Sequence, residues 1–544
     1  MAPSRETACV CRERGPLASP ANRRPSPPNL PTPVRTLHLV LRDQLDRDAV
    51  LRSIDPETDA VAMTEADANR GPFDEHTHRL VLGFAAMRHV RNDLTERGIT
   101  VHYQTADADD VAADAPDFLR QQIQAHQPER VRMTEPGRIS LLESLEAVCE
   151  EAGVPLAVHA DDHFLVTHDA FNAWADGRKE LTLEYFYREQ RRAYNVLLTN
   201  AGDPVGGDWN FDKQNRETFG RDGPGRLPEP ATFAPDAITQ EVIEMVRRVF
   251  PEAPGSADAF AWPVTPTQAE AALDDFIQNR LPNFGTYQDA MWTGRPFLYH
   301  SRLSAALNLK LLDPLDAIQK AEQAYHDGHA PLNAVEGFIR QILGWREFVR
   351  GIYWLYGSDY LQKNALDATH AIPDFYWTGD TQMRCMQECA GQVAEHAYTH
   401  HIARLMVLGL FGLLYGVDPK QMNAWHEAMY VDAWEWVSAP NMMGMALYAD
   451  GGITGTKPYT ASGKYIGRMS NYCRNCVYDK AEATGDAACP FTTLYWNFLD
   501  RHHDTLKGNR RMNFQLANVR RKSDAELAAI ADRAAALRDH IDQV

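Results

Sequence analysis

The order of strand-like and helix-like segments divides this chain at about residue 165. Before that point, short apolar segments typical of buried strands alternate with amphipathic helical patterns. The strand-like segments are 37–41, 99–103, 130–134 and 155–159, and the helical ones are 79–97, 109–126 and 139–152. This alternation predicts an α/β domain with a parallel, Rossmann-like sheet over residues 36–165. The domain has no G-x-G-x-x-G or P-loop motif, so a standard dinucleotide or triphosphate site is not indicated.

Strand signals nearly vanish in the rest of the chain. Residues 166–235 combine an aromatic-rich helix with a Gly-, Pro- and Asp-rich loop, which we interpret as an interdomain connection. Helical patterns follow at 237–250, 266–279, 301–310, 315–326, 333–357, 381–415, 419–430, 491–505 and 523–541. They predict a large all-α domain over 236–515 and a C-terminal helix within 516–544. Residues 1–35 contain eight Pro and no apolar signal-peptide core, and they are interpreted as a disordered arm.

The charge of the chain is unevenly distributed. The net charge is −19, from 55 basic and 74 acidic residues, which at first argues against nucleic-acid binding. However, residues 36–450 carry −27, whereas residues 451–522 carry +7. DNA contacts are therefore expected only in this C-terminal basic segment, and the candidates are Arg468, Arg474, Lys480, Arg510 and Arg511. No run of 18 apolar residues occurs, so no transmembrane helix is expected.

Three of the eight cysteines lie close together in the sequence Cys473-x2-Cys476-x12-Cys489-Pro490. Eight cysteines in 544 residues do not make a disulfide scaffold, and a reducing compartment is expected. A tight C-x-x-C turn lets two thiolates reach one metal site, and Cys385 or Cys389 is the candidate fourth ligand. Four thiolates bind Zn²⁺ or a [4Fe–4S] cluster. The aromatic surroundings favour the cluster, and unligated core cysteines are the alternative.

Six further segments form a specific set together with these cysteines. They are LVLRDQL at 39–45, WNFDK at 209–213, FGTYQDAMW at 284–292, GWREF at 344–348, YTHHIARLM at 398–406 and KPY at 457–459. On these residues the chain resembles the iron–sulfur bacterial cryptochromes and photolyases, the prokaryotic (6-4) photolyase group of the photolyase/cryptochrome superfamily. The resemblance covers residues 36–515. It implies a [4Fe–4S] cluster held by Cys385, Cys473, Cys476 and Cys489.

The resemblance also implies that the helical domain binds FAD. The cofactor contacts it implies are Tyr287, His300, Ser301, Leu303, Ser304, Arg404, Asp432 and Asn441. Hydroxyls and backbone N–H groups suit the pyrophosphate, although Ser301 and Ser304 are also typical helix-capping residues. Arg404 and Asp432 match an ion pair beside the isoalloxazine ring, where a cation favours the anionic reduced flavin. In the family a Glu tends to stand near flavin N5, where this chain has Ser438, and Asn441 is the candidate to substitute for it.

The catalytic residues implied by the resemblance are His400, His401, Tyr459 and Asp289. In the (6-4) reaction a His donates a proton to the lesion, and its unperturbed pKa of about 6.5 suits that role. Read without the resemblance, adjacent His residues in an apolar helix are more often core or metal-binding residues. Asp212 matches a loop acid that the family links to Mg²⁺. One carboxylate alone is a weak metal signal.

Aromatic residues and an antenna complete the expected photochemistry. Trp377 and Trp425 match positions that carry electrons from the surface to FAD. The next relay residue is often Tyr, but here it is His426, so Trp434, Tyr430 or another aromatic residue would take the outer step. The family antenna is 6,7-dimethyl-8-ribityllumazine, and Asp43, at the end of the first predicted strand, matches a contact position. Residues 65–75 diverge from the acidic loop of the family.

These observations predict light-driven repair of pyrimidine (6-4) photoproducts in UV-damaged DNA. Two other functions stay open at this point. One is a blue-light-sensing cryptochrome of the same fold with little repair activity, and the other is a non-photochemical DNA-binding iron–sulfur protein. We expect a monomeric bacterial protein of the cytoplasm, without membrane contact and associated with the nucleoid when bound to DNA.

Overall fold

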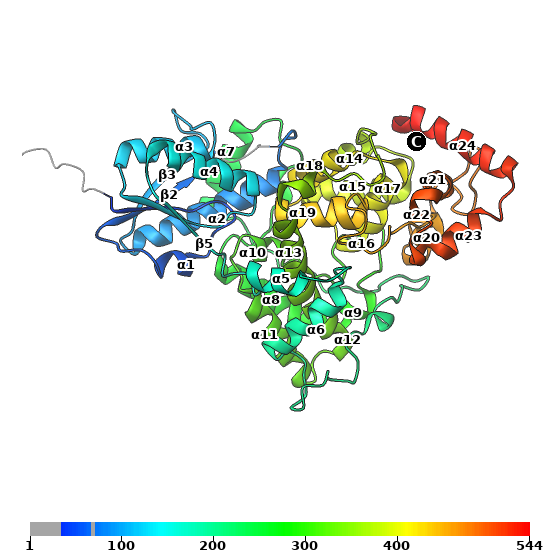
Figure 1. Cartoon of the computed structure of the whole chain (residues 1–544), viewed down its shortest axis with the longest axis horizontal. Coiled ribbons are helices and arrows are strands. Elements are labelled where there is room, and N and C mark those ends of the chain that lie inside the picture. Colours follow the sequence, from blue (N-terminus) through cyan, green and yellow to red (C-terminus); the bar gives the residue numbers. More distant parts are fainter. Residues whose placement is uncertain (1–33, 67–70) are drawn as a thin grey trace, which may run out of the picture.

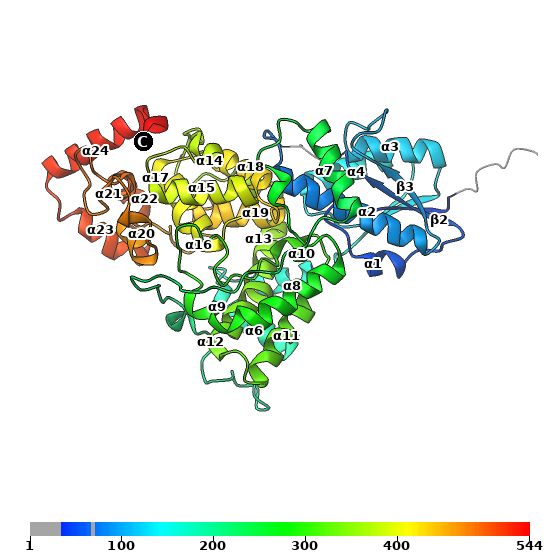
Figure 2. The same ribbon diagram turned by 180° about the vertical axis from the view of Figure 1, so that it is seen from behind.

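The computed structural model describes residues 34–66 and 71–544, so most of the predicted N-terminal arm lies outside the described residues. Figures 1 and 2 show an α/β domain at one end of the molecule and, at the other, a lobe built from residues 463–544. Most of the remaining helices lie between these two ends or extend below them. No described helix combines the length and the apolar character needed to cross a bilayer.

The α/β domain contains a five-stranded parallel sheet, which confirms the predicted fold class. Its strands are β1 (Thr36–Leu39), β2 (Asp59–Thr64), β3 (Thr100–Gln104), β4 (Arg130–Thr134) and β5 (Leu156–His159), in the order β3-β2-β1-β4-β5. The helices of this domain are α1 (Arg47–Leu51), α2 (Thr77–Glu96), α3 (Ala115–His126) and α4 (Ile139–Ala152). Helices cover both faces of the sheet, as parallel sheets require.

Strand β2 is absent from the sequence prediction. Its sequence is Asp-Ala-Val-Ala-Met-Thr, in which two Ala residues weaken the β signal. In the structure, Ala60 and Ala62 pack against α3 and α4, whereas Val61 and Met63 belong to the core around α2. Successive side chains of a strand point to opposite faces, so the small residues meet one helix layer and the large ones the other. Burial on both faces, rather than local propensity, makes this segment a strand.

The rest of the described chain is helical apart from isolated bridges. The connection contains α5 (His168–Ala175), α6 (Leu183–Tyr194) and η1 (Asp212–Gln214). The central helices are α7 (Ala237–Val249), η2 (Ala257–Ala259), α8 (Pro266–Asn279), α9 (Leu281–Tyr287), α10 (Ser304–Asn308), α11 (Pro314–His326), α12 (Leu332–Ile339), η3 (Arg340–Arg346), α13 (Glu347–Tyr356), η4 (Gly357–Gln362), α14 (Phe375–Thr378), α15 (Arg384–His396), α16 (His401–Ala403), η5 (Arg404–Gly409), α17 (Leu410–Tyr415), α18 (Pro419–Met429), α19 (Glu435–Ala439) and η6 (Pro440–Ala446).

The C-terminal lobe consists of shorter elements. They are α20 (Gly463–Met469), η7 (Tyr472–Arg474), α21 (Pro490–Arg501), α22 (His503–Leu506), η8 (Arg510–Met512), α23 (Asn513–Val519), α24 (Asp524–Asp539) and η9 (Ile541–Gln543). Helix α24 packs along α21, and the backbone carbonyl of the terminal Val544 accepts hydrogen bonds from Thr381 and Gln382. These contacts join the end of the chain to the start of α15.

Two predicted helices are interrupted, and both interruptions shape the functional site. The helix predicted over 381–415 is broken after α15, where Ala397 adopts a left-handed conformation (φ 51°). His400 is therefore an extended N-cap residue of α16, which corrects the prediction that His400 lies inside an apolar helix. The helix predicted over 301–310 begins only at Ser304, because Arg302 is also left-handed (φ 60°).

Candidate functional site

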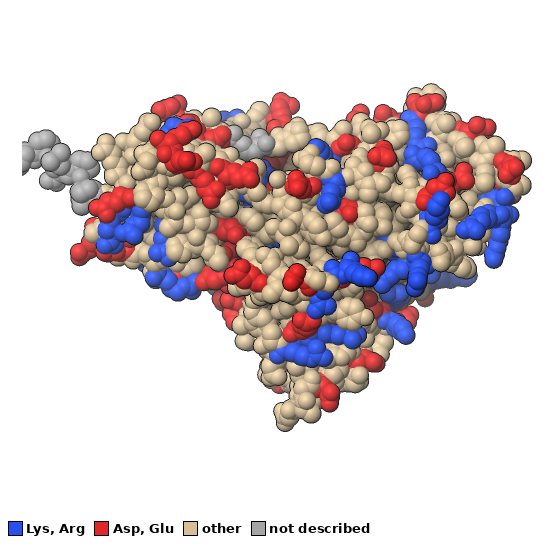
Figure 3. Space-filling view, in the orientation of Figure 1, with Lys and Arg blue, Asp and Glu red and all other residues tan. Residues whose placement is uncertain are grey.

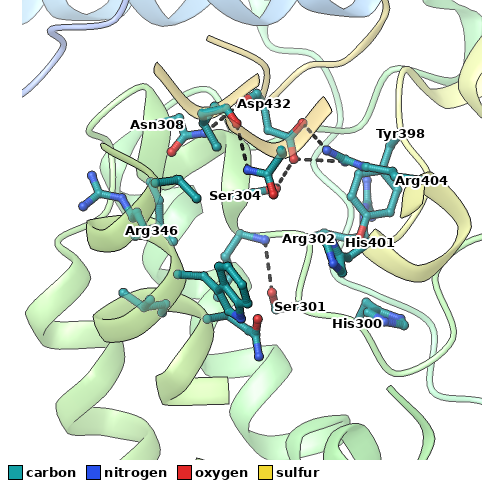
Figure 4. A pocket seen from close by; sticks show the side chains of 18 of the residues that line it. His300, Ser301, Arg302, Ser304, Asn308, Arg346, Tyr398, His401, Arg404 and Asp432 are labelled. Carbon is teal, nitrogen blue, oxygen red and sulfur yellow. Dashed lines mark hydrogen bonds and ion pairs between the residues drawn. The ribbon is translucent and has the colours of Figure 1, made fainter. Parts of the chain in front are cut away.

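A cavity of about 310 Å³ lies within the helical domain, in the region shown in Figure 4. Seven of the eight residues predicted to contact FAD line it: His300, Ser301, Leu303, Ser304, Arg404, Asp432 and Asn441. The eighth, Tyr287, is not among the lining residues, and its ring packs between Phe219 and Tyr299 with centroid distances of 4.6 and 5.8 Å. The sequence prediction thus locates one continuous site.

Three π-helical segments supply much of the cavity wall. Segment η3 contributes Trp345 and Arg346, η5 contributes Arg404, and η6 contributes Asn441 and Met442. Each segment interrupts or extends an otherwise α-helical run. π-Helical turns are rare and are found mostly at functional sites, because the wider turn redirects side chains. No sequence pattern predicted them.

The loop before α10 forms one side of the cavity and is held by an unusual arginine. Arg302 and Leu298 both adopt left-handed backbone conformations, which are strained for residues other than Gly. The Arg302 guanidinium lies between the rings of Trp262 and Phe297, at 4.4 and 4.2 Å from their centroids. Burial lowers its pKa to about 10. These cation–π contacts stabilise the loop that presents Ser301 and Ser304.

Arg404 and Asp432 form a two-pronged ion pair at the cavity wall. Both guanidinium–carboxylate distances are 3.0 Å, and the Ser304 hydroxyl donates to the same carboxylate at 2.5 Å. Burial favours a higher pKa for Asp432, but the attraction of Arg404 outweighs it and lowers the pKa. Ser304 makes no helix-capping hydrogen bond, so the capping alternative does not hold for this residue. The network keeps a buried positive charge beside the cavity.

The two adjacent histidines have different environments. His401 lines the cavity and exposes its ring there, whereas His400 is buried behind it and stacks on His300 at a centroid distance of 4.2 Å. Partial loss of water around the ring within the cavity wall, with a smaller contribution from Arg404, lowers the pKa of His401 to about 4. The ring of His401 is therefore neutral at pH 7 in the free protein. Only His401 of this pair can touch a ligand in the cavity as the structure stands.

The other predicted catalytic residues lie at different depths. Asp289 lines the cavity, and burial raises its pKa to about 6 although Arg216 opposes the shift. Tyr459 is partly buried and is not among the residues that line the cavity, but it lies within electrostatic range of Arg511. Asp212, the carboxylate predicted to act with Mg²⁺, forms an ion pair with Arg340. One of its two oxygens is therefore already bound by the guanidinium group.

The predicted electron-transfer residues form a continuous row of rings. Trp377, which is partly exposed, lies 6.4 Å from Trp425, and Trp425 lies 5.7 Å from Tyr430. Tyr430 stacks on His426 at 4.4 Å, and His426 lines the cavity. Trp434 lies elsewhere, against the guanidinium groups of Arg42 and Arg79. The sequence prediction missed that His426 is part of the cavity wall.

The four predicted cluster ligands surround one small cavity in the C-terminal lobe. Cys385, Cys473, Cys476 and Cys489 all line it, together with the aromatic residues Tyr472, Tyr478 and Phe491. Cys389 is fully buried one turn from Cys385 and does not line this cavity, which favours Cys385 as the fourth ligand. Burial, and then the proximity of Cys489 and Cys473, raises the pKa of the Cys385 thiol. Among the described residues, no three His, Cys, Asp or Glu side chains are placed to hold a single metal ion.

A second large cavity, of about 360 Å³, lies between the α/β domain and helices α18 and α19. Asp43 lines it, accepts a hydrogen bond from the Gly137 backbone N–H at 2.7 Å, and has its pKa raised by burial. Glu75 also lines it. Burial favours a higher pKa for Glu75, but Arg42 and Arg79 lower it to about 2. Within the divergent segment 65–75, residues 67–70 lie outside the described residues.

A basic surface covers part of the C-terminal lobe. Between Asp504 and Asp524 the chain has six basic residues and no acidic one. Arg468, Arg474, Arg510 and Arg511 are all exposed, and Figure 3 shows Lys and Arg side chains gathered on this lobe and along the adjoining edge of the molecule. Phe514, on α23, is 74% exposed within the same segment. Cations beside an exposed aromatic ring are a suitable surface for DNA.

Comparison with known proteins gives a consistent result. The family described as "Deoxyribodipyrimidine photo-lyase-related protein" matches residues 38–262. A (6-4) photolyase of Agrobacterium fabrum is 45% identical over 508 residues, which cover 93% of this chain and 99% of that protein. The structure is similar to a bacterial class III photolyase from Agrobacterium tumefaciens, with a TM-score of 0.51 and 15% identity over 80% of this chain and 86% of the other. It is also similar to a Synechocystis cryptochrome, with a TM-score of 0.54 and 13% identity over 80% and 89%.

Proposed function

This chain belongs to the (6-4) photolyase family, and from that premise we propose that it repairs pyrimidine (6-4) photoproducts in DNA, using light absorbed by bound FAD. Family membership implies FAD, and the donor set of the first cavity fits that cofactor. The hydroxyl of Ser301, which lines the cavity, suits a phosphate, and the Arg404–Asp432 pair, with Ser304 bound to it, suits the flavin ring. The observation that carries the proposal is the position of His401 in the same cavity wall.

The residues of this wall have distinct roles in the proposed reaction. When bound, FAD supplies the photoexcited electron that starts repair. Arg404, fixed by Asp432, holds a positive charge beside the cofactor ring. His401 donates a proton to the lesion so that the hydroxyl group can return to the 5′ base. A DNA phosphate close to His401 raises its pKa from about 4, because an opposite charge favours the charged ring.

Access of the lesion requires that the damaged bases leave the helix, as base chemistry generally does. Asp289 lines the cavity, and Tyr459 lies near Arg511. We therefore assign Asp289 and Tyr459 to the wall of the lesion pocket, between the basic surface and His401. Asp212 is the candidate acid through which Mg²⁺ would act, after exchange of its Arg340 partner.

The test of this function is light-dependent repair. Purified protein, loaded with FAD and reduced, is incubated with an oligonucleotide that contains one (6-4) photoproduct. We expect restoration of the undamaged bases under blue light and no change in the dark. A parallel substrate with a cyclobutane dimer measures lesion specificity. Unchanged (6-4) photoproduct in the light, in a protein that binds FAD and DNA, would favour a signalling cryptochrome instead.

Trp377 and Trp425 are proposed to bring electrons to the flavin from outside. Trp377→Phe should slow light-driven reduction of bound flavin at least about tenfold, because the partly exposed end of the row of rings is lost. The rate is followed by flavin absorption under illumination with an external reductant. Trp434→Phe is the matched control and should reduce at the wild-type rate, since Trp434 packs against Arg42 and Arg79. The reverse result would move the relay to Trp434.

The basic surface is proposed to bind DNA phosphates. Arg510→Glu combined with Arg511→Glu should weaken DNA binding by about 10- to 100-fold at low salt. The double substitution should also make the slope of log K against log salt less steep, by the amount that roughly two phosphate contacts contribute. Fluorescence anisotropy over a salt series measures both effects. The matched control is Arg247→Glu with Arg248→Glu, an adjacent exposed pair on α7. Equal losses in the two double variants would show a nonspecific charge effect.

We propose that the two other cavities hold the remaining cofactors. We propose that Cys385, Cys473, Cys476 and Cys489 hold a [4Fe–4S] cluster, because four thiols line one small cavity with aromatic walls. The second large cavity, which contains Asp43, is proposed to bind the antenna 6,7-dimethyl-8-ribityllumazine. Helix α18 borders both large cavities, with His426 on one and Glu427 on the other. The antenna would thus lie beside the helix that separates it from the flavin site.

A further inference from the structure

His426 lines the main cavity, and one of its ring nitrogens has no hydrogen-bond partner among the described residues. Its side chain is 4% exposed and lines the cavity from the last turn of α18. Nδ1 lies 3.0 Å from the Ser438 hydroxyl, whereas the buried Nε2 has no hydrogen-bond partner among the described residues. Buried polar atoms without partners are rare in native proteins. The unpaired nitrogen therefore points to a ligand as its partner.

The imidazole is held firmly in this orientation. Tyr430, the residue after α18, stacks on one face of the ring with an interplanar angle of 26°. Ser438 comes from a different helix, α19, and is fully buried. A stacked face and a hydrogen bond at Nδ1 restrict rotation of the ring. We therefore expect His426 to keep this orientation when a ligand enters.

The hydrogen bond to Ser438 also decides which nitrogen carries the proton. The Ser438 side chain has no other hydrogen bond within the described part of the chain. If Nδ1–H donated to Ser438, the buried hydroxyl hydrogen would lack an acceptor, which is unfavourable. The hydroxyl therefore donates to Nδ1. In a neutral imidazole the proton must then be on Nε2, so His426 is a hydrogen-bond donor at the cavity wall.

The ring is neutral at physiological pH. Burial, with smaller contributions from Arg404, Arg79 and His401, lowers the pKa of His426 to about 3, although Asp432 opposes the shift. Asp432, whose carboxylate binds Arg404 and Ser304, makes no hydrogen bond with Nε2. Since no described residue pairs with Nε2–H, an acceptor atom of a bound ligand is the partner that we infer for it.

We propose that His426 donates a hydrogen bond from Nε2 to an acceptor atom of the flavin ring, and that Ser438 positions it by fixing the tautomer. This inference rests on the proposed binding of FAD in this cavity. Positions 426 and 438 are two of the places, besides residues 65–75, at which this chain departs from the pattern of the family it resembles. In this structure they form one hydrogen-bonded pair, so a donor from α18 serves the flavin where the family tends to have a Glu.

The test compares variants of the two residues. Apoprotein is titrated with FAD, and the dissociation constant and the shape of the blue absorption band are measured. His426→Phe and Ser438→Ala should each weaken binding by about 5- to 10-fold and alter the band, because one neutral hydrogen bond is lost. Ser438→Thr, which keeps the hydroxyl, should stay within about twofold of wild type. His502→Phe is the matched control, a partly buried histidine that lines a different cavity, and it should bind FAD normally.

A second measurement needs no variant. Nitrogen-15 NMR of labelled histidine in the wild-type apoprotein should show His426 as the Nε2–H tautomer, and FAD should shift that proton resonance. Thermal unfolding of each apoprotein shows whether a variant is folded. An Nδ1–H tautomer, or unchanged FAD affinity and absorption in folded His426→Phe, would overturn the inference while the proposed function stands. A wild-type apoprotein that takes up no FAD would overturn both.

Discussion

His401→Ala should lose about 10²- to 10⁴-fold in the rate of (6-4) repair under light, the usual contribution of one acid–base group. His401 is the histidine of the adjacent pair that lines the cavity. Its removal takes away the proposed proton donor and leaves the Arg404–Asp432 pair in place. Bound flavin should therefore remain. The measurement is single-turnover repair of bound oligonucleotide, with flavin content determined on the same sample.

His400→Phe is the matched control for this variant. His400 stacks on His300 behind the cavity, and Phe preserves a ring at that position. Repair should stay within a few-fold of wild type. If His400→Phe abolished repair and His401→Ala did not, the catalytic assignment within the pair would be reversed.

The pH dependence adds a second readout for His401. The acid form is the one that donates a proton, so repair of bound DNA should fall as pH rises through the pKa of His401 in the complex. That pKa must lie above the value of about 4 in the free protein, because the phosphates of DNA favour the charged ring. The decline with pH should be absent from the residual activity of His401→Ala.

Cys473→Ala should remove the iron–sulfur cluster. With one of four ligands lost, iron content should fall from about four atoms per chain toward zero, and the broad visible absorption of the cluster should disappear. We also expect the C-terminal lobe to become sensitive to protease, because binding energy of a metal centre is also folding energy. Elemental analysis, absorption spectra and limited proteolysis measure these effects.

Two other cysteines serve as controls for the cluster. Cys149 is buried in α4, and Cys389 is buried beside the cluster cavity without lining it. Cys149→Ala and Cys389→Ala should both retain iron. Loss of iron in Cys389→Ala would show that Cys389 is a ligand. Zinc instead of iron in the wild-type protein would show that these cysteines hold zinc and not an iron–sulfur cluster.

The sequence was sufficient to predict the broad fold and the chemistry of the site. Hydrophobic periodicity placed β4, α4 and α8 at their observed bounds, because each has a strong local pattern. It missed β2, where Ala60 and Ala62 have little strand preference and burial by α3 and α4 decides the structure. The spacing of the cysteines and the histidine pair identified the chemistry, because these side chains are uncommon and their spacing is informative.

Only the tertiary structure decided how each side chain is oriented. The left-handed residues Ala397 and Arg302 interrupt two predicted helices, and π-helical segments turn Trp345, Arg404 and Asn441 toward one cavity. These features depend on packing between segments far apart in the sequence, which local periodicity does not record. For the same reason, the sequence named both His400 and His401 but did not distinguish them. The sequence determined which reactive groups this protein has, and the packing of its helices decided which of them face the cavity.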